Sequence, residues 1–176
     1  MKRISLIIAL TFLSSQLYAD TFKAKVMRVL DGDTIAVVKD KDPEEIKVRL
    51  VFVDCPEKTQ EYGQEAKQYT YRATNSKMVT IKSEKTDRYG RTLGEVILPD
   101  GSSLNKKLIE TGSCWHYSQY DKNPDLDKME KNAKAKRLGL WSESNPTPPW
   151  EYRHSKKVKH PEFFEQTDLN YPESRK

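Results

Sequence analysis

Histidine, cysteine and long apolar runs are scarce in this sequence, and each shortage removes a class of protein. The three histidines, His116, His154 and His160, lack the spacing of metal ligands, so a histidine-based metal site is not expected. No internal repeat occurs, and no low-complexity tract precedes residue 142. The 176 residues are most simply one domain with extensions, long enough to bury a core without staples.

The longest apolar run, residues 4–17, is too short for the roughly 20 residues that a membrane-spanning helix needs. It follows the charged residues Lys2 and Arg3 and ends at Ala19, where a small residue suits cleavage before Asp20. The sequence therefore predicts a signal peptide at residues 1–19 rather than a membrane anchor. We expect a secreted or periplasmic protein with no membrane association after cleavage.

Charge is only mildly unbalanced. The net charge is +5, and cleavage before Asp20 removes Lys2 and Arg3, leaving 29 basic and 26 acidic residues, or +3. This excess permits a polyanionic partner without requiring one, and it also aids solubility. The lysine-rich run from Lys128 to Lys136 reads as the solvated face of a helix rather than a nucleic-acid groove.

The chain has two cysteines, Cys55 and Cys114. An even number in an oxidising compartment favours a disulfide, with two buried thiols as the alternative. A bridge between them would close a long loop and contribute a few kcal/mol in the chain-entropy picture.

Alternating apolar residues predict strands at residues 22–30, 34–38, 46–53, 77–82 and 91–98. Helical spacing predicts helices at residues 62–76, from Ser102 or Ser103 to Gly112, and at 124–137. Five strands with about three helices match an α+β fold, a small and partly open β-barrel of the oligonucleotide/oligosaccharide-binding (OB) type. The domain is expected to span residues 20–141.

Residues 142–176 are rich in proline, charge and single aromatics. They predict an extended tail that lies against the domain through Trp150 and Tyr152 and is loosely ordered after Lys156.

Four carboxylates, Asp31, Asp33, Asp54 and Glu57, are expected to converge at one rim of the barrel. Strand alternation along residues 48–54 places Arg49 on one face and Asp54 on the other, and Pro56 ends the strand before Glu57. Such a cluster is costly unless a cation offsets it.

Six motifs in this order and spacing resemble the staphylococcal nuclease (thermonuclease) family. They cover roughly Phe22 to Trp141, and five in sequence are hard to obtain by accident. They are Asp31-Gly32-Asp33-Thr34, Val48-Arg49-Leu50, Val53-Asp54-Cys55-Pro56-Glu57, Tyr62-Gly63-Gln64-Glu65-Ala66, Thr86-Asp87-Arg88-Tyr89-Gly90-Arg91 and Ala135-Lys136-Arg137-Leu138-Gly139-Leu140-Trp141.

The resemblance implies calcium-dependent hydrolysis of phosphodiester bonds in DNA and RNA, with little sequence specificity and 3′-phosphorylated products. It implies that Ca²⁺ is held by the carboxylates of Asp33 and Asp54 and by the backbone carbonyl of Cys55. The family commonly has threonine or alanine at this last position, but a main-chain ligand survives the change. The connection from Glu57 to Tyr62 is shorter than in the family's best-known member, and we expect this to affect substrate access.

By the same resemblance, Glu57 is the general base, and Arg49 and Arg91 clamp the scissile phosphate. Tyr89 and Tyr117 are candidates for contact with the nucleotide, with Tyr120 competing for the place of Tyr117. We expect the protein to act as a monomer on DNA and RNA.

Plainer readings stay open. Asp33 and Asp54 are also turn formers, Arg49 could serve a structural salt bridge, Glu57 could pair with a helix N-terminus, and rim tyrosines often only pack. The competing functions are a non-catalytic nucleic-acid-binding barrel and an exported scaffold or adhesion module that uses the tail.

Overall fold

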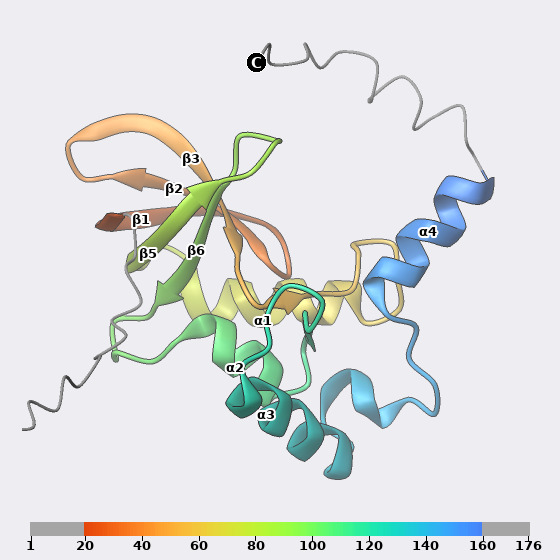
Figure 1. The fold of residues 1–176 in the computed structure, drawn as a ribbon. Coiled ribbons are helices and arrows are strands. Elements are labelled where there is room, and N and C mark those ends of the chain that lie inside the picture. The colour runs from red at the N-terminus through yellow and green to blue at the C-terminus, as the bar shows by residue number, and fades with distance from the viewer. Residues whose placement is uncertain (1–19, 160–176) are drawn as a thin grey trace, which may run out of the picture.

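Five strands close into a barrel in the computed structural model, which describes residues 20–159 (Figure 1). Around the barrel the order is β1 (Asp20–Asp31), β2 (Thr34–Lys39), β3 (Asp42–Leu50), β6 (Thr92–Ile97) and β5 (Met78–Thr86). All neighbours are antiparallel except β3 and β6. The predicted α+β barrel is therefore confirmed, and the parallel β3–β6 pair closes a sheet that was expected to stay partly open. The predicted signal peptide lies outside the described residues.

The barrel interior is filled by the alternating apolar residues that predicted the strands. They are fully or almost fully buried, as expected for one packed face of each strand, and include Val26, Ile35, Val37, Val48, Leu50, Val79, Ile81 and Val96. The outward positions of β3 and β5 are mostly charged, which keeps this sheet face in water.

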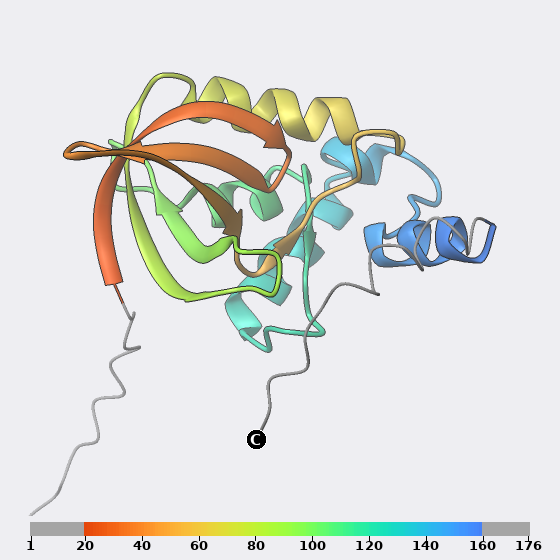
Figure 2. The same cartoon turned by 90° about the horizontal axis from the view of Figure 1, so that it is seen from above.

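Three helices cover the barrel and one end of it. α1 (Gly63–Thr74) packs along β1 on the outside of the barrel (Figure 2). α2 (Leu104–Glu110) packs against α3 (Pro124–Ala135), and the Ser103 and Asn123 side chains cap their N-termini. A 3₁₀ turn, η1 (Gly139–Ser142), follows α3. These helices occupy the ranges predicted for them to within a few residues.

The strand expected at residues 46–53 is wrong in its second half. β3 ends at Leu50, Val51 and Phe52 form a turn in which Phe52 has φ 68°, and the chain resumes as β4 (Val53–Asp54). β4 pairs with β7 (Trp115–His116) in a separate two-stranded sheet. Asn105 supports the turn from α2 by donating its side-chain amide to the Val51 carbonyl at 2.8 Å. The turn cancels the predicted alternation, so Arg49 and Asp54 are no longer constrained to opposite faces.

The extended tail expected after residue 142 is also wrong at Pro149–Lys159, which form helix α4. Proline suits the first helical position because its φ is preset and its missing N–H would have no intrahelical partner. The predicted contacts through Trp150 and Tyr152 are present: the Trp150 ring lies 5.5 Å from the Trp115 ring, and the Tyr152 hydroxyl donates to the Thr59 carbonyl at 2.9 Å. α4 thereby lies beside the loop between β4 and α1 in both views (Figures 1 and 2). No helix within residues 20–159 has the length and apolar character needed to cross a membrane.

Candidate active site

The turn at residues 31–34 holds its two aspartates against the end of β4. A Cβ atom on Gly32 would lie 2.7 Å from Cβ of Cys55 and 3.0 Å from Cβ of Ala66, so only glycine lets the turn approach this closely. The backbone N–H of Cys55 donates to Asp33 Oδ2 at 2.9 Å, and the Thr70 hydroxyl donates to the Gly32 carbonyl. Asp33 is therefore fixed to the loop that carries Asp54 and Glu57.

Arg49 lies between two of the carboxylates. Its Nη2 atom is 3.2 Å from Asp33 Oδ2 and 3.0 Å from Asp54 Oδ1, and its Nη1 atom donates to the Val53 carbonyl at 2.9 Å. The side chains of Arg49 and Asp54 are 13% and 1% exposed, so these charges depend on one another for solvation. The turn at Val51 and Phe52 makes this contact geometrically feasible.

A disulfide joins Cys55 to Cys114, with the two Cα atoms 4.2 Å apart. Cys114 precedes β7, so the bridge lies beside the β4–β7 pair and ties the predicted carbonyl ligand to the end of α2. The backbone N–H of Cys114 donates to the Leu108 carbonyl at 3.0 Å, which anchors the other side of the bridge.

Glu57 lies on the loop between β4 and α1, and the start of α1 holds its backbone. The N–H of Gln60 donates to the Glu57 carbonyl at 2.8 Å, and a Cβ on Gly63 would lie 1.9 Å from that same oxygen. The Glu57 side chain is 38% exposed. Its carboxylate is therefore open to solvent while its backbone is constrained.

Arg153 of α4 is a residue of this site that sequence reasoning missed. Its Nη2 atom lies 2.7 Å from Asp54 Oδ2, and its Nη1 atom lies 3.2 Å from Asp54 Oδ1 and 2.8 Å from Glu57 Oε1. Asp54 thus sits between the guanidinium groups of Arg49 and Arg153. The Pro-Pro-Trp sequence that starts α4 could have indicated a helix, but nothing in it indicates which surface the helix covers.

Arg91 lies at the start of β6, and its ion pair in the described part of the chain is with Asp87. Asp87 Oδ2 accepts from Arg91 Nε and lies 2.8 Å from Nη2, while Oδ1 accepts the backbone N–H groups of Tyr89 and Arg91. Thr92 pairs with Val48 across the parallel strands, so Arg91 emerges beside the strand that carries Arg49. The structure fixes Arg91 on this neighbouring turn and does not bring it into contact with the carboxylates.

The three candidate tyrosines have different surroundings. Tyr117 donates its backbone N–H to the Phe52 carbonyl at 2.8 Å, and its pKa is raised first by burial and then by the charge of Asp54, so it faces the carboxylates. Tyr120 packs on Tyr117 with the ring centroids 4.7 Å apart but is 80% exposed. Tyr89 is 66% exposed, with the Arg91 guanidinium 5.4 Å from its ring centre.

The carboxylates Asp31, Asp33, Asp54 and Glu57, which we call the carboxylate cluster, are costly to ionise together. Burial, the charge of Asp33 and a hydrogen bond with Asp33 raise the pKa of Asp31 to about 7. One buried oxygen of Asp31 has no hydrogen-bond partner. Burial also raises the pKa of Asp54, although Arg153 and Arg49 oppose the shift.

The donor set fits a hard cation. All its side-chain donors are carboxylate oxygens, which Ca²⁺ and Mg²⁺ prefer, and an added positive charge would relieve the raised pKa values. Within residues 20–159, no group of three or more His, Cys, Asp or Glu side chains is arranged to hold a metal. Two carboxylates with a backbone carbonyl, the predicted set, would not form such a group.

The family described as Staphylococcal nuclease homologue has a model that matches residues 47–143, more than half of the chain. The chain belongs to this family. The staphylococcal nuclease match contains Arg49, Asp54, Glu57 and Arg91, whereas Arg153 lies beyond its end.

Relatives over most of the chain carry nuclease names. An "Uncharacterized endonuclease" of Escherichia coli O157:H7 is 41% identical over 132 residues, which are 75% of this chain and 85% of that protein. A "Micrococcal nuclease" of Shigella flexneri is 37% identical over 146 residues, 77% of this chain and 83% of that protein. "Protein ParB" of Escherichia coli is 34% identical over 163 residues, 87% and 90% of the two chains. Family membership and these names support a nuclease.

Proposed function

We propose that this chain is an exported, calcium-dependent endonuclease that hydrolyses phosphodiester bonds of DNA and RNA with little sequence specificity and leaves 3′-phosphorylated products. The observation that carries the proposal is Arg49 held between Asp33 and Asp54, on the barrel of a staphylococcal nuclease homologue. A guanidinium and a cation beside one another would bind and polarise a phosphodiester from two sides.

Asp33, Asp54 and the Cys55 carbonyl would hold the cation. Bound there, Ca²⁺ would supply Lewis-acid polarisation of the phosphate and a more acidic water. The support comes from the oxygen-only donors, the raised pKa values of Asp31 and Asp54 and the bond from Cys55 N–H to Asp33, which brings the two loops together.

Glu57 would accept the proton of the attacking water, because its carboxylate is partly exposed on a loop whose backbone is fixed. Arg49 would donate to the phosphate oxygens on which charge grows in the transition state. Arg91 would complete this clamp from the adjacent strand, since Asp87 contacts only its Nε and Nη2 atoms and a guanidinium has five N–H donors. Tyr117 and Tyr89 would contact the nucleotide on either side.

The deciding experiment is a cleavage assay with residues 20–176. Plasmid, single-stranded DNA and RNA are each incubated with Ca²⁺, with Mg²⁺ or with chelator, and the product ends are tested for removal of a 3′-phosphate. We expect loss of all three substrates with Ca²⁺ only. Cleavage that is unchanged in chelator would reject the calcium requirement, and products with 3′-hydroxyl ends would reject the proposed chemistry.

Arg153 favours one alternative, a barrel that binds nucleic acid without cutting it, because its guanidinium already neutralises Asp54 and Glu57. Retardation of single-stranded DNA with no cleavage in any of the three conditions would favour that alternative.

Export is tested separately. The mass and the N-terminal residue of protein recovered from periplasm or medium should correspond to a chain that starts at Asp20. A protein found inside the cell and starting at Met1 would reject export.

A further inference from the structure

α4 covers two parts of the proposed site at once. Arg153 binds Asp54 and Glu57, and one turn earlier the Trp150 ring stacks on the Tyr117 ring at 5.9 Å with an angle of 9° between the planes. The helix therefore engages a predicted cation ligand, the predicted base and a predicted nucleotide contact. These are independent contacts, one between charges and the other between rings.

The charge contact is incompatible with the proposed chemistry. Both oxygens of Asp54 are in contact with guanidinium nitrogens, Oδ1 with Arg49 and Arg153 and Oδ2 with Arg153. A cation on Asp54 would face the positive charge of Arg153 at a distance where repulsion is strong. Glu57 is likewise tied up, because an oxygen that accepts from Arg153 is a poorer proton acceptor for water.

The attachment of α4 is peripheral and mostly polar. Of the side chains from Trp150 to Lys156, none is fully buried, and Pro149 alone of the described helix residues is. Gln60 donates to the Thr147 carbonyl, and Lys156 donates to the Thr59 hydroxyl at 3.0 Å. Such contacts are individually worth little, so release of the helix would leave the core intact.

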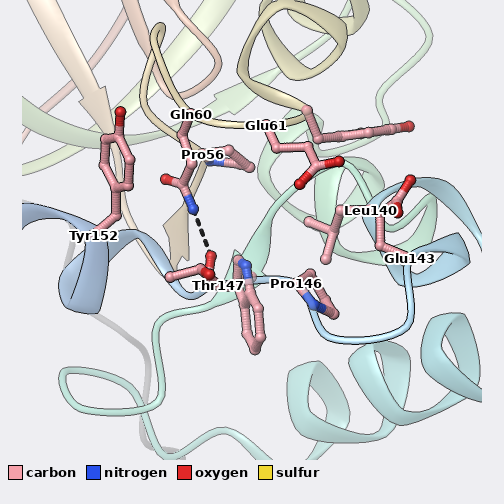
Figure 3. Close-up of a pocket in the computed structure, with 10 residues that line it drawn as sticks. Pro56, Gln60, Glu61, Leu140, Glu143, Pro146, Thr147 and Tyr152 are labelled. Atoms are coloured by element: carbon pink, nitrogen blue, oxygen red, sulfur yellow. Dashed lines mark hydrogen bonds between the residues drawn. The ribbon is translucent and has the colours of Figure 1, made fainter.

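A pocket of about 180 Å³ separates the segment leading into α4 from the loop after β4. Figure 3 shows Gln60 reaching across to Thr147 while Pro146 and Glu143 lie on the opposite wall. The segment is thus attached at points rather than packed along its length, as expected for an element that can detach.

We propose that α4 is an autoinhibitory strap, in which Arg153 takes the place of the divalent cation at Asp54 and Glu57 while Trp150 covers Tyr117. This inference rests on the proposed calcium-dependent nuclease. Docking of the strap and binding of the cation exclude one another, so each weakens the other by the same factor. The strap keeps the carboxylates neutralised and the nucleotide contact covered until the cation displaces it.

The test measures Ca²⁺ binding by calorimetry, without nucleic acid, in residues 20–176. Arg153→Ala and Trp150→Ala should each lower the dissociation constant of Ca²⁺ by about tenfold, the change expected for roughly 1.4 kcal/mol of coupling. Trp150→Ala alters no charge, so its effect cannot come from long-range electrostatics. Arg28→Ala, which removes the same charge from an exposed pair with Glu45, should leave the constant unchanged.

A second readout follows the helix itself. Amide hydrogen exchange in residues 150–159 should speed up when Ca²⁺ is added to the wild-type protein, while the barrel strands exchange no faster. In Arg153→Ala the helix should exchange rapidly with and without Ca²⁺. Equal or greater protection of α4 with Ca²⁺ would overturn the strap.

The outcomes separate the two proposals. If Ca²⁺ binds and DNA is cut, but both variants bind Ca²⁺ no more tightly than wild type, the strap is refuted and the nuclease stands. If Arg153→Ala binds Ca²⁺ more weakly, Arg153 supports the site instead of blocking it, which also refutes the strap. If neither wild type nor variants bind Ca²⁺, the calcium site and the strap fall together.

Discussion

At the scale of single residues, Asp54 shows how strongly the site depends on cations. Its side chain is 1% exposed and is flanked by Arg49 and Arg153, and burial still raises its pKa. A buried carboxylate of this kind is stable only when positive charge is close on more than one side. Arg49 is a fixed part of that charge, and the other part can be supplied by Arg153 or by a metal ion.

Glu57→Gln tests the proposed base. The amide keeps the size of the side chain but cannot accept a proton, so cleavage of DNA with Ca²⁺ should slow by roughly 10²–10⁴-fold. The measurement is initial rate at saturating Ca²⁺, with circular dichroism to confirm folding. Glu61→Gln is the matched control, because Glu61 is an exposed carboxylate of the same loop, and its rate should be near wild type. Comparable rates for the two variants would remove Glu57 as the base.

Gly32→Ala tests the close approach of the aspartate turn to Cys55. The added methyl group would meet Cβ of Cys55 at 2.7 Å, so we expect a loss of about 1–3 kcal/mol in the free energy of unfolding, together with a lower cleavage rate as Asp33 moves. Gly101→Ala is the control: its Cβ has open space and its φ is 81°, so it should lose stability through backbone strain alone. A Gly32→Ala protein with a normal cleavage rate would contradict this placement of Asp33.

At the scale of secondary-structure elements, the sequence predicts much of the fold because strand and helix periods are local properties. Residues 34–38 and 63–74 show this, since their apolar spacing alone places β2 and α1. The end of β3 could not be predicted, because a phenylalanine at φ 68° is unfavourable locally and is sustained by distant support such as Asn105. The contact between Arg49 and Asp54 depends on that turn, so the motifs indicated which residues meet but the strand pattern did not indicate how.

The turn between β5 and β6 yields a prediction about pH. Burial acts to raise the pKa of Asp87, but hydrogen bonds from the N–H and the guanidinium of Arg91 and from the N–H of Tyr89 outweigh it and lower the pKa. A carboxylate with a lowered folded-state pKa contributes stability above its unfolded value near 3.9, and this contribution is lost as pH falls through the folded value.

The measurement is a double-mutant cycle of Asp87→Ala and Arg91→Ala in urea unfolding. At pH 6 the coupling should be about 1–2 kcal/mol, since both partners are charged and hydrogen-bonded. At pH 3 and below the coupling should diminish as Asp87 gains a proton. Coupling that is absent at pH 6, or that grows towards low pH, would contradict the anchoring of Arg91 by Asp87.

At the scale of the whole molecule, the site is assembled from parts far apart in the chain. Arg153 reaches Asp54 from 99 residues away, and no local pattern records such a contact. The sequence indicated only that the tail would lie against the domain through its aromatics. Helix α4 and its docking depend on a surface made by β4, β7 and the loop before α1, which exists only after the barrel has closed.

The disulfide is the one covalent link between these parts, and its removal gives the last prediction. Cys55 and Cys114 are 59 residues apart, and closing a loop of this length removes unfolded-state entropy worth about 4 kcal/mol at 25 °C. Urea unfolding of residues 20–176 should therefore show roughly that loss of stability on reduction. Cys55→Ala with Cys114→Ala should be insensitive to reductant, which controls for effects of reductant elsewhere.

Because Cys55 N–H also holds Asp33, the reduced protein should bind Ca²⁺ more weakly even where it remains folded. Two thiols that are freely alkylated in the native oxidised protein, or unchanged stability on reduction, would contradict the role of the bridge. Folding in a reducing compartment would then be no handicap. If the loss is observed, a chain of this kind reaches full stability only where disulfides form, which is consistent with the proposed export and ties the geometry of Asp33 and Cys55 to the compartment in which the protein folds.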